Sequence, residues 1–519
     1  MAAPNTHHHG NTTSLAEHYE FICEYMASGT IPVAKYRSKR TGLTIVLARV
    51  EGLVNGYFTL ATEAHDDDGL PHTLEHLVFL GSEEYPYKGI LDLLANRCLA
   101  SGTNAWTDTD HTAYTVQTAG SEGFLNLLPI YLDHLLYPTL TDSGFITEVY
   151  HITEEGEDAG VVYSEMQGRE NTDSDRTLRA LLRAMYPEGS GYRSETGGIM
   201  ENLRESTTNK KIRDYHRAFY RPENLHMIIT GMVGPEQVFK ALEPMEQKIM
   251  SKGDRGPYTR PWQSPVAPLT ASVDELVMYP SDSEDTGLVL VAWRGPSAVE
   301  DISELLSMSV LMEYLTHSSI SPLPKIFVEV DDPLASGVHH SCFENSVSTC
   351  YFGFYGVPKD KVNSVSPLLM GTLSKIGAGE MPIDMETMKD ILTNLVLLQD
   401  SSLETLPHDT IANSAIGDVL YGRTCGHVSP ATEVLLRGWI ILVLRPPSTV
   451  RSGRTTIGQI WLDPTRLDRE WGDFGLSDGL TAGRMRPSSV WFLDPTDHPV
   501  QTGSHRECAD REANRQFRH

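Results

Sequence analysis

The five residues from His72 to His76, His-Thr-Leu-Glu-His, constrain the fold of this chain more than any other stretch. Residues four apart on a helix lie on the same face, with their Cβ atoms about 5–6 Å apart. On a helix, His72 and His76 would therefore be close enough to bind one metal ion, and Glu75 would lie at the edge of the same face. The spacing predicts a helix built around a pair of metal ligands.

The residues around this motif favour a helix that starts just before it and buries one side. Asp66, Asp67 and Asp68 are expected to supply the N-cap and first-turn acids, and Pro71 suits an early helical position. An apolar side is provided by Leu74, Leu77, Val78 and Leu80. The order of the motif reverses the H-E-x-x-H zinc helix, which indicates hydrolysis by a zinc-activated water with Glu75 as general base.

A catalytic zinc usually has three protein ligands and one position for water, so a third ligand is required. Two downstream stretches offer a carboxylate. One is an acidic cluster of Glu154, Glu155, Glu157 and Asp158, and such a run of charges is typical of a solvated turn. The other is Glu165, at the predicted buried start of a helix, where a carboxylate needs a partner such as a metal ion. The residues alone favour Glu165 and leave the cluster open.

The motif from His72 to His76, followed by Gly-Val-Val-Tyr-Ser-Glu-Met-Gln-Gly from Gly160 to Gly168, resembles the pitrilysin-like (M16) zinc metallopeptidases, the inverzincins. The second stretch is most similar to the presequence-protease branch and its eukaryotic cytosolic relatives. The resemblance runs over residues 1 to about 430, the N-terminal half of such proteins. It implies that the two histidines and Glu165 hold one Zn²⁺ ion, with the glutamate of the motif as the base.

The bacterial branch of this family has a shorter spacing, which would place the third ligand near Thr153. Threonine cannot serve in this role, so spacing points instead to Glu154 or Glu155. We prefer Glu165 because its local sequence matches the family.

The family also keeps an acidic residue that supports a metal ligand, two helical turns before the third ligand. Asp158 occupies that place, and Glu157 is the neighbour that could displace it. His111 and His151 are expected to be structural or exposed rather than metal ligands.

A substrate-binding strand is the second feature that the resemblance implies. In the family, an open edge strand beside the metal pairs with the substrate through backbone hydrogen bonds. Asn104, Ala105 and Trp106 match those positions. From the residues alone, this stretch is equally typical of an ordinary edge strand after a glycine turn.

Composition excludes some classes of partner. The formal net charge of −27 argues against nonspecific nucleic-acid binding. No run of 18 apolar residues is present, so no membrane span and no membrane partner are expected. The six cysteines show no C-x-x-C pattern and are typical of free thiols, and the N-terminus lacks an apolar or basic targeting pattern. These features predict a cytoplasmic protein.

The predicted fold class is α+β, with two duplicated pitrilysin-like α/β sandwich domains and an irregular C-terminal tail. A strand at 287–293 and a helix at 304–315 repeat the order of the first domain without a second His-Glu-His motif. The predicted segments are an N-terminal arm (1–30), a zinc-binding catalytic domain (31–248), a linker (249–270), a metal-free second domain (271–436) and the tail (437–519).

The tail differs in composition from the rest of the chain. It has 12 arginines, no lysine and 10 acidic residues, and no helix or strand period persists in it. A shifted reading frame or a retained intron would produce such a change.

Two functions remain open. The first is a zinc endopeptidase acting on unfolded peptides. The second is a non-catalytic M16-like peptide-binding or partner subunit, because family members are about twice this length. In such members the C-terminal half closes over the substrate and supplies an arginine and a tyrosine. A second half or a separate chain is therefore an expected partner that completes the chamber.

Overall fold

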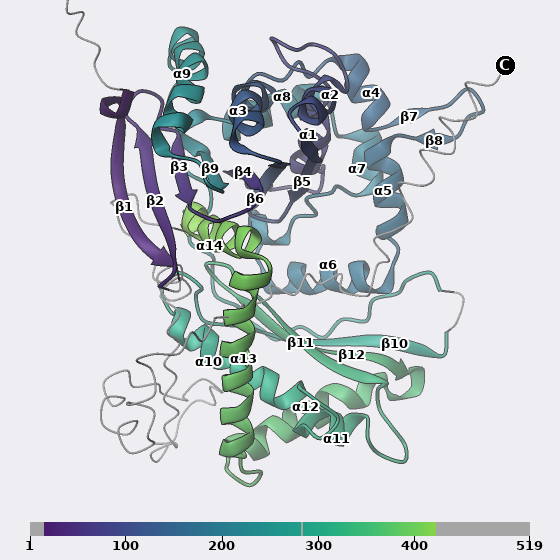
Figure 1. Ribbon diagram of the computed structural model, residues 1–519. Helices are drawn as coiled ribbons and strands as arrows, with labels where there is room; N and C mark the ends of the chain where they lie inside the picture. The colour runs from purple at the N-terminus through teal and green to yellow at the C-terminus, as the bar shows by residue number, and fades with distance from the viewer. Residues whose placement is uncertain (1–14, 28, 282–283, 422–519) are drawn as a thin grey trace, which may run out of the picture.

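The structure, a computed structural model, describes residues 15–27, 29–281 and 284–421 (Figure 1). Its two larger sheets are each covered by helices, which confirms the predicted α+β class. The predicted tail at 437–519, and residues 422–436 before it, lie outside the described residues.

The first domain is built on a seven-stranded sheet in the order β1-β2-β3-β9-β4-β6-β5. Neighbouring strands are antiparallel except for β3 and β9, which are parallel. In that order, the strands are β1 (Tyr19–Ala27), β2 (Ile31–Ser38), β3 (Thr44–Ala48), β9 (Leu225–Thr230), β4 (Val54–Ala61), β6 (His111–Thr118) and β5 (Ala100–Thr107). The two edges of the sheet are therefore β1 and β5.

Alternate residues of these strands point to opposite faces of the sheet, so the central strands contribute side chains to two separate cores. Ile45 and Leu47 pack under a layer of helices, whereas Val46 and Ala48 belong to the core on the other face. The helix layer consists of α1 (Leu70–Val78), α2 (Ile90–Arg97), α3 (Ser121–Leu136), α8 (Asn209–Phe219) and α9 (Pro235–Lys252).

A short hairpin interrupts the helices beside α1. The elements are α4 (Asp142–Glu148), β7 (His151–Ile152), β8 (Asp158–Ala159), α5 (Val161–Arg169), α6 (Asp173–Met185) and α7 (Met200–Glu205). The Tyr163 N–H donates to the Val149 carbonyl at 3.2 Å, a bond that spans fourteen positions where a helix spans four. Helix α5 thus resumes the hydrogen-bonding of α4, and ten residues are looped out between them (Figure 1).

The second domain has a three-stranded antiparallel sheet in the order β10-β12-β11. Its elements are β10 (Thr286–Arg294), α10 (Ile302–Thr316), α11 (Pro322–Phe327), β11 (Gly337–Phe343), β12 (Thr349–Pro358), α12 (Val362–Gly377), α13 (Met385–Thr405) and α14 (Pro407–Tyr421). Short 3₁₀ turns occur at Leu15–His18, Gly191–Arg193, Pro222–Asn224 and Lys359–Lys361.

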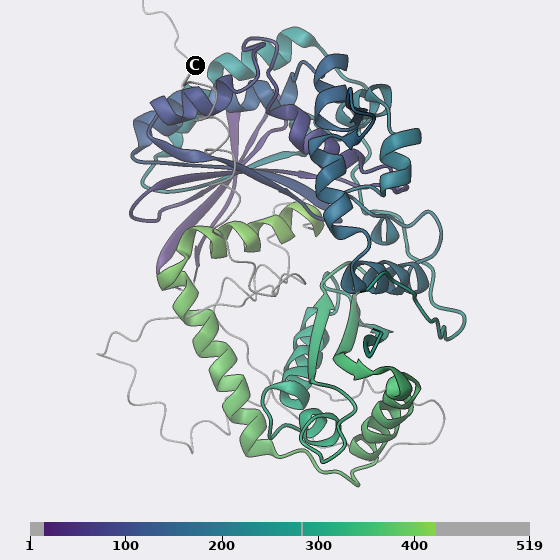
Figure 2. The same cartoon turned by 90° about the vertical axis from the view of Figure 1, so that its right-hand side faces the viewer.

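The two domains each place a helix on the sheet of the other. Helix α6 of the first domain packs against β10, and α14 lies across β4 and β9 (Figures 1 and 2). Polar contacts fix α14 in place, because Tyr57 donates to Asp409 and Lys35 pairs with Asp418. The end of the predicted second domain therefore completes the core of the first.

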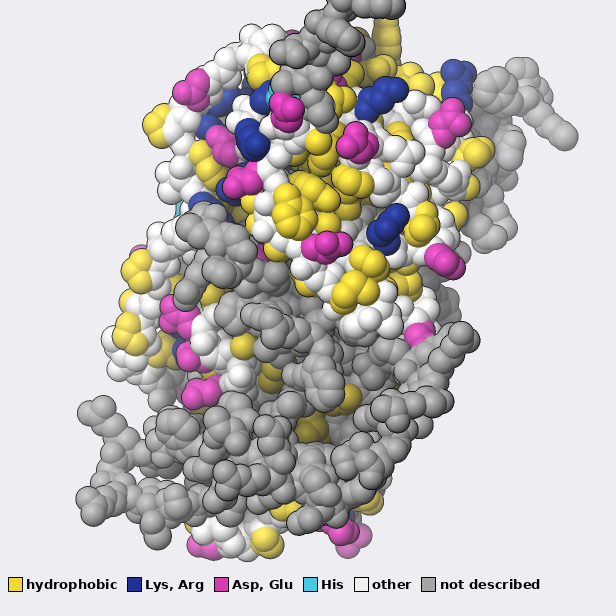
Figure 3. Space-filling view, turned by 60° about the vertical axis from the view of Figure 1, so that its left-hand side comes forward, with side chains coloured by type: hydrophobic (Ala, Val, Ile, Leu, Met, Phe, Trp, Pro, Cys, Tyr) yellow, Lys and Arg dark blue, Asp and Glu magenta, His cyan; other side chains and the backbone are white. Residues whose placement is uncertain are grey.

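The prediction of a loose N-terminal arm over residues 1–30 is wrong for residues 19–27. These residues form the edge strand β1, which pairs with β2 from Tyr19 to Ala27 with one register shift between Phe21 and Cys23. Tyr19 is buried and stacks on Phe239 of α9, with ring centroids 3.9 Å apart. Its outward-facing Phe21 remains 55% exposed, and Figure 3 shows apolar side chains gathered on this side of the first domain. Residues 19–27 are thus part of the sheet, at its outer edge, and do not form a separate arm.

The predicted linker at 249–270 begins inside α9, which runs to Lys252. Trp262, within it, is buried and stacks on Tyr192 at 4.4 Å between ring centroids. Its indole N–H donates to the Thr62 and Asp110 carbonyls. The segment is thus anchored on the first domain.

The expectation of free cysteines holds for Cys23 and Cys98. It is wrong for Cys342 and Cys350, which face each other across β11 and β12 and form a disulfide. Within the described ranges, no helix combines the length and apolar composition that crossing a bilayer requires. The cytoplasmic location stays a prediction.

Candidate metal centre

Helix α1 carries the motif and begins at Leu70, with Pro71 in its first turn. Its N-cap is Gly69, in the left-handed region at φ 67°, where an added Cβ would lie 2.5 Å from the Gly197 carbonyl oxygen. The expectation that the preceding aspartates cap the helix is wrong, because no side chain caps it and its first turn holds no acid. Asp68 instead bonds Ser206 and Lys211, tying the start of α1 to the segment that leads into α8.

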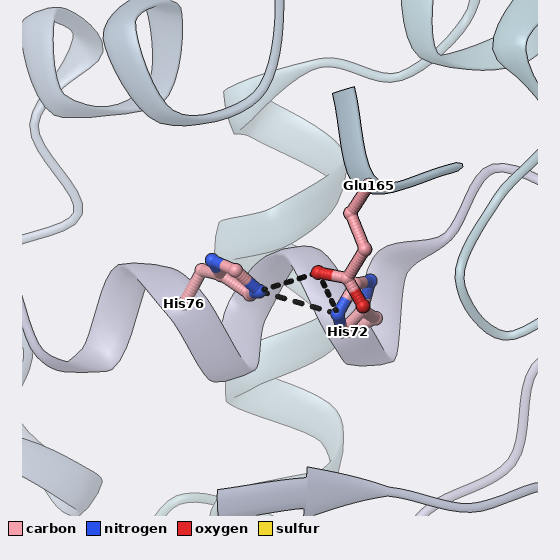
Figure 4. A group of neighbouring side chains, drawn as sticks. All are labelled: His72, His76 and Glu165. Carbon is pink, nitrogen blue, oxygen red and sulfur yellow. Dashed lines mark hydrogen bonds and ion pairs between the residues drawn. The ribbon is translucent and has the colours of Figure 1, made fainter. Parts of the chain in front are cut away.

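The three predicted ligands converge on one point (Figure 4). His72 Nε2 and His76 Nε2 lie 3.2 Å apart on successive turns of α1. Glu165 Oε2, from α5, lies 3.5 Å from His72 Nε2 and 3.7 Å from His76 Nε2. Among the described residues, this is the only group of three or more such side chains whose donor atoms all lie within 4.8 Å of one another.

These distances fit a zinc ion. Tetrahedral zinc with bonds of about 2.0–2.1 Å holds its ligand atoms about 3.3 Å apart. The separations of 3.2, 3.5 and 3.7 Å lie close to that value. Two imidazoles and a carboxylate are also the donor set of hydrolytic zinc sites that keep one position for water. The Glu165 side chain is 44% exposed, so the centre is open to solvent on that side.

The close contacts shift the pKa values of the ligands. Hydrogen bonds with His72 and His76 outweigh burial and hold the pKa of Glu165 far below its usual range. Burial opposes the charged form of His76, but its contacts with Glu148 and Glu165 raise its pKa to about 9. The cluster therefore attracts positive charge, which a divalent cation would supply.

Glu148, the last residue of α4, contacts the ring nitrogen of His76 that does not face the other two ligands. His76 Nδ1 lies 3.3 Å from Glu148 Oε1, and Lys88 contacts the other carboxylate oxygen at 3.4 Å. Burial raises the pKa of Glu148, but His76 and Lys88 outweigh it and lower the pKa. A carboxylate on Nδ1 fixes the orientation of the ring and leaves Nε2 for the metal.

The assignment of Asp158 as this supporting residue is wrong. Asp158 lies in β8, where it accepts from the Tyr150 and Tyr163 hydroxyls and pairs with Arg204. Seventeen positions separate Glu148 from Glu165, and the looped-out ten leave seven, or about two helical turns. Glu148 therefore lies about two helical turns before Glu165 in space, as expected of the supporting acid. The inserted hairpin makes their separation in the sequence longer.

The open alternatives for the third ligand lie in the same hairpin. Glu154, Glu155 and Glu157 are exposed in and beside its turn, and none belongs to the converging group. His151 bonds the Ile146 carbonyl, and the buried His111 pairs with Asp110. The acidic cluster is thus a solvated turn, and neither histidine approaches the centre.

Glu75 is buried beside the two histidines, with 9% of its surface exposed. Burial raises its pKa, and a hydrogen bond from Thr107 partly offsets this rise. Thr107 Oγ1 donates to Glu75 Oε2 at 2.6 Å. Sequence analysis missed this contact, although Thr107 directly follows the predicted substrate residues.

Those three residues lie on β5, which is the outer strand of the sheet. Asn104 is exposed, while Ala105 packs toward the helix layer. Trp106 packs on the opposite face, and its indole N–H donates to His111 Nε2 at 2.9 Å. Strand β5 ends at Thr107, so the sheet edge that these residues form leads directly to the residue that contacts Glu75.

Comparisons with known proteins show which sequences and folds this chain is similar to. Residues 61–180 match the family model "Insulinase (Peptidase family M16)", and residues 206–392 match "Peptidase M16 inactive domain". An uncharacterized protein of Caenorhabditis elegans is 43% identical over 402 residues, which cover 77% of this chain and 40% of the relative. The mitochondrial presequence protease of Xenopus laevis is 27% identical, covering 64% of this chain and 33% of the relative.

The crystal structure of pitrilysin has the same fold, with a TM-score of 0.54 at 13% identity, over 81% of this chain and 45% of that one. The chain thus spans less than half the length of the relatives and of pitrilysin. With two family models matched in order and the fold shared, the chain belongs to the M16, pitrilysin-like family.

Proposed function

We propose that this chain is a zinc-dependent endopeptidase that hydrolyses unfolded peptides, with one Zn²⁺ per chain. The observation that carries the proposal is the spacing of His72 Nε2, His76 Nε2 and Glu165 Oε2, which matches a tetrahedral zinc site. These residues would hold the ion, with Glu148 orienting His76. When bound, zinc supplies Lewis-acid activation of a water and of the peptide carbonyl.

Glu75 is the group that moves protons in this proposal. Its buried carboxylate, one position before His76, accepts a proton from the attacking water and later returns it to the leaving amine. Thr107 holds one carboxylate oxygen of Glu75 and so leaves the other directed at the water. The raised pKa of Glu75 suits a group that must both take and give a proton.

The substrate would bind as an added strand on β5. A strand at a sheet edge presents unpaired backbone N–H and carbonyl groups, and an extended peptide can pair with them. Pairing along Asn104, Ala105 and Trp106 would bring the peptide past Thr107 to Glu75 and the metal. Only an unfolded segment can offer a free backbone in this way, which is why we propose unfolded peptides as substrates.

A second half or a separate chain is proposed to complete the chamber. The chain covers 40% of the length of the C. elegans relative, and the matched second domain is described as inactive. The same observation supports the second candidate, a non-catalytic peptide-binding or partner subunit. If groups that stabilise the transition state lie in the part of the relatives that this chain does not match, turnover by this chain alone would fall by about 10²–10³.

The two candidates are separated by assaying the purified chain with one equivalent of zinc and a quenched fluorescent peptide. The first predicts cleavage that Glu75→Gln abolishes while the bound zinc remains. One zinc per chain without turnover would select the second. A chain that binds no zinc would contradict the peptidase proposal.

A further inference from the structure

A basic cleft lies on the helix side of the first domain, and none of the three proposed metal ligands lines it. It has a volume of about 420 Å³, within the range of small-molecule sites. Arg213, His216 and Arg217 share one face of α8, and Arg255, after α9, also lines the cleft. The rest of the lining comes from the end of α3 and the segment after it, and consists of Leu136, Pro138, Thr139 and Leu140. Among the described residues, no acidic side chain lines this space, which we call the arginine cleft.

The three guanidinium groups keep donors available for a ligand. Each has five N–H groups. Arg213 makes three hydrogen bonds, to the Leu140 carbonyl and to Asp142. Arg217 makes one, to Asp214. Arg255 makes two, to backbone carbonyls. More than half of these donors are therefore not used within the described residues.

The local charge is positive in a strongly acidic protein. Besides Arg213 and Arg217, Lys210 adds a cation near the cleft and shares Asp214 with Arg217, while Lys211 on the same helix pairs with Asp68. Asp142 and Asp214 are the carboxylates that the first three cations contact, so with Arg255 four cations face two anions. The chain as a whole carries −27. The cleft is therefore a locally positive site in a protein whose net charge is negative.

His216 also lines the cleft, on the same face of α8 as the two arginines. Its Nε2–H donates to the Leu135 carbonyl at 2.8 Å. Burial, with the nearby Arg255 and Arg217, lowers its pKa to about 4. It is therefore neutral at pH 7, and the positive charge of the site comes from the arginines alone.

We propose that the arginine cleft binds the phosphate group of a small molecule. Guanidinium groups bind phosphate oxygens in pairs and with fixed geometry, and charge strengthens each hydrogen bond. Arg213 and Arg217, one helical turn apart, lie on the α8 side of the cleft. The apolar side chains after α3 provide a surface for an organic group attached to the phosphate. This site is independent of the proposed peptidase activity.

The test is isothermal titration of the full chain with inorganic phosphate, phenyl phosphate and uncharged phenol. Arg217→Gln is the main variant, since its side chain is 70% exposed and Lys210 still pairs with Asp214. Lys240→Gln, an exposed lysine on α9, removes the same charge outside the cleft. Arg213→Lys keeps the positive charge but removes the planar guanidinium group that can donate two parallel hydrogen bonds to a phosphate.

We expect both phosphates to bind and phenol not to bind. Arg217→Gln should weaken binding about tenfold or more, as loss of a charged hydrogen bond implies, while Lys240→Gln leaves it unchanged. Arg213→Lys should also weaken it. Tighter binding of phenyl phosphate would assign the ligand as an organic phosphate, and equal affinities would assign free phosphate. Absence of binding, or equal losses in Arg217→Gln and Lys240→Gln, would overturn the proposal.

Discussion

Each domain brings two histidines and a glutamate close together, but only the first domain directs them at one point. In the second domain, Glu313 lies between His317 and His340, with its Oε1 2.7 Å from His317 Nδ1 and its Oε2 3.7 Å from His340 Nε2. The carboxylate therefore separates the two rings, and His340 Nδ1 also contacts the Thr316 hydroxyl at 2.8 Å. In this group the carboxylate itself contacts both rings, whereas in the first domain three ligand atoms face a common centre.

The difference comes from the elements that carry the residues. In the first domain, both rings sit on α1 and the carboxylate arrives from a separate helix, α5. In the second, the glutamate and one histidine share the end of α10, a helix whose other side is buried in the domain core. The comparison teaches that residue type and proximity do not suffice for a metal site. The donors must approach from directions that leave a space of one ion between them.

The largest effect is expected on removing the carboxylate from each group. Glu165→Ala should lower zinc affinity by more than about 100-fold, since even loss of a supporting residue costs 10–100-fold. Glu313→Ala, its counterpart in the second domain, should leave zinc affinity unchanged. Competition with a chromophoric chelator measures both. Equal affinities in the two variants would break the distinction between the domains.

The second prediction concerns the base. Glu75→Gln keeps the size of the side chain and the bond to Thr107, and should lower peptide turnover by about 10²–10⁴. Zinc content should stay at one per chain. Glu304→Gln, an exposed glutamate in the first turn of α10, is the matched control and should keep full turnover. Retained turnover in Glu75→Gln would remove this residue from the mechanism.

The third prediction tests the supporting carboxylate. Glu148→Gln should weaken zinc binding by about 10–100-fold because His76 loses a charged partner. Asp158→Asn should leave zinc binding unchanged, since its contacts go to Tyr150, Tyr163 and Arg204. The same chelator competition applies. If Asp158→Asn were the more damaging of the two, the hairpin would not be a simple insertion between α4 and α5.

The smallest effect is expected at Thr107. Thr107→Val removes the hydroxyl and keeps the shape, so kcat should fall about tenfold as Glu75 loses a hydrogen bond, with KM little changed. Thr107→Ser should restore kcat. Steady-state kinetics separates the two constants. A rise in KM with constant kcat would place Thr107 in peptide binding rather than beside the base.

How far the sequence predicts the site depends on how local each feature is. The histidine pair, Glu75 and Glu165 were predictable because a helical repeat and a short matching stretch carry them. Glu148 was not, because ten looped-out residues change the count between it and Glu165. Thr107 was missed because its partner lies 32 positions away.

The same reasoning applies to the fold. The α+β class and the repeated strand–helix order follow from hydrophobic periods that a sequence displays. The pairing of β1 and the crossing of α14 onto β4 and β9 depend on contacts between distant segments. Residues 19–27 therefore resembled an arm, and residues 407–421 resembled part of the second domain.

The most direct test of the account is anomalous diffraction at the zinc edge from crystals of the chain grown with zinc. The account predicts one peak per chain, about 2.0–2.1 Å from His72 Nε2 and His76 Nε2 and from a Glu165 oxygen. A peak at His317 and His340 instead, or none at the α1 histidines, would contradict it.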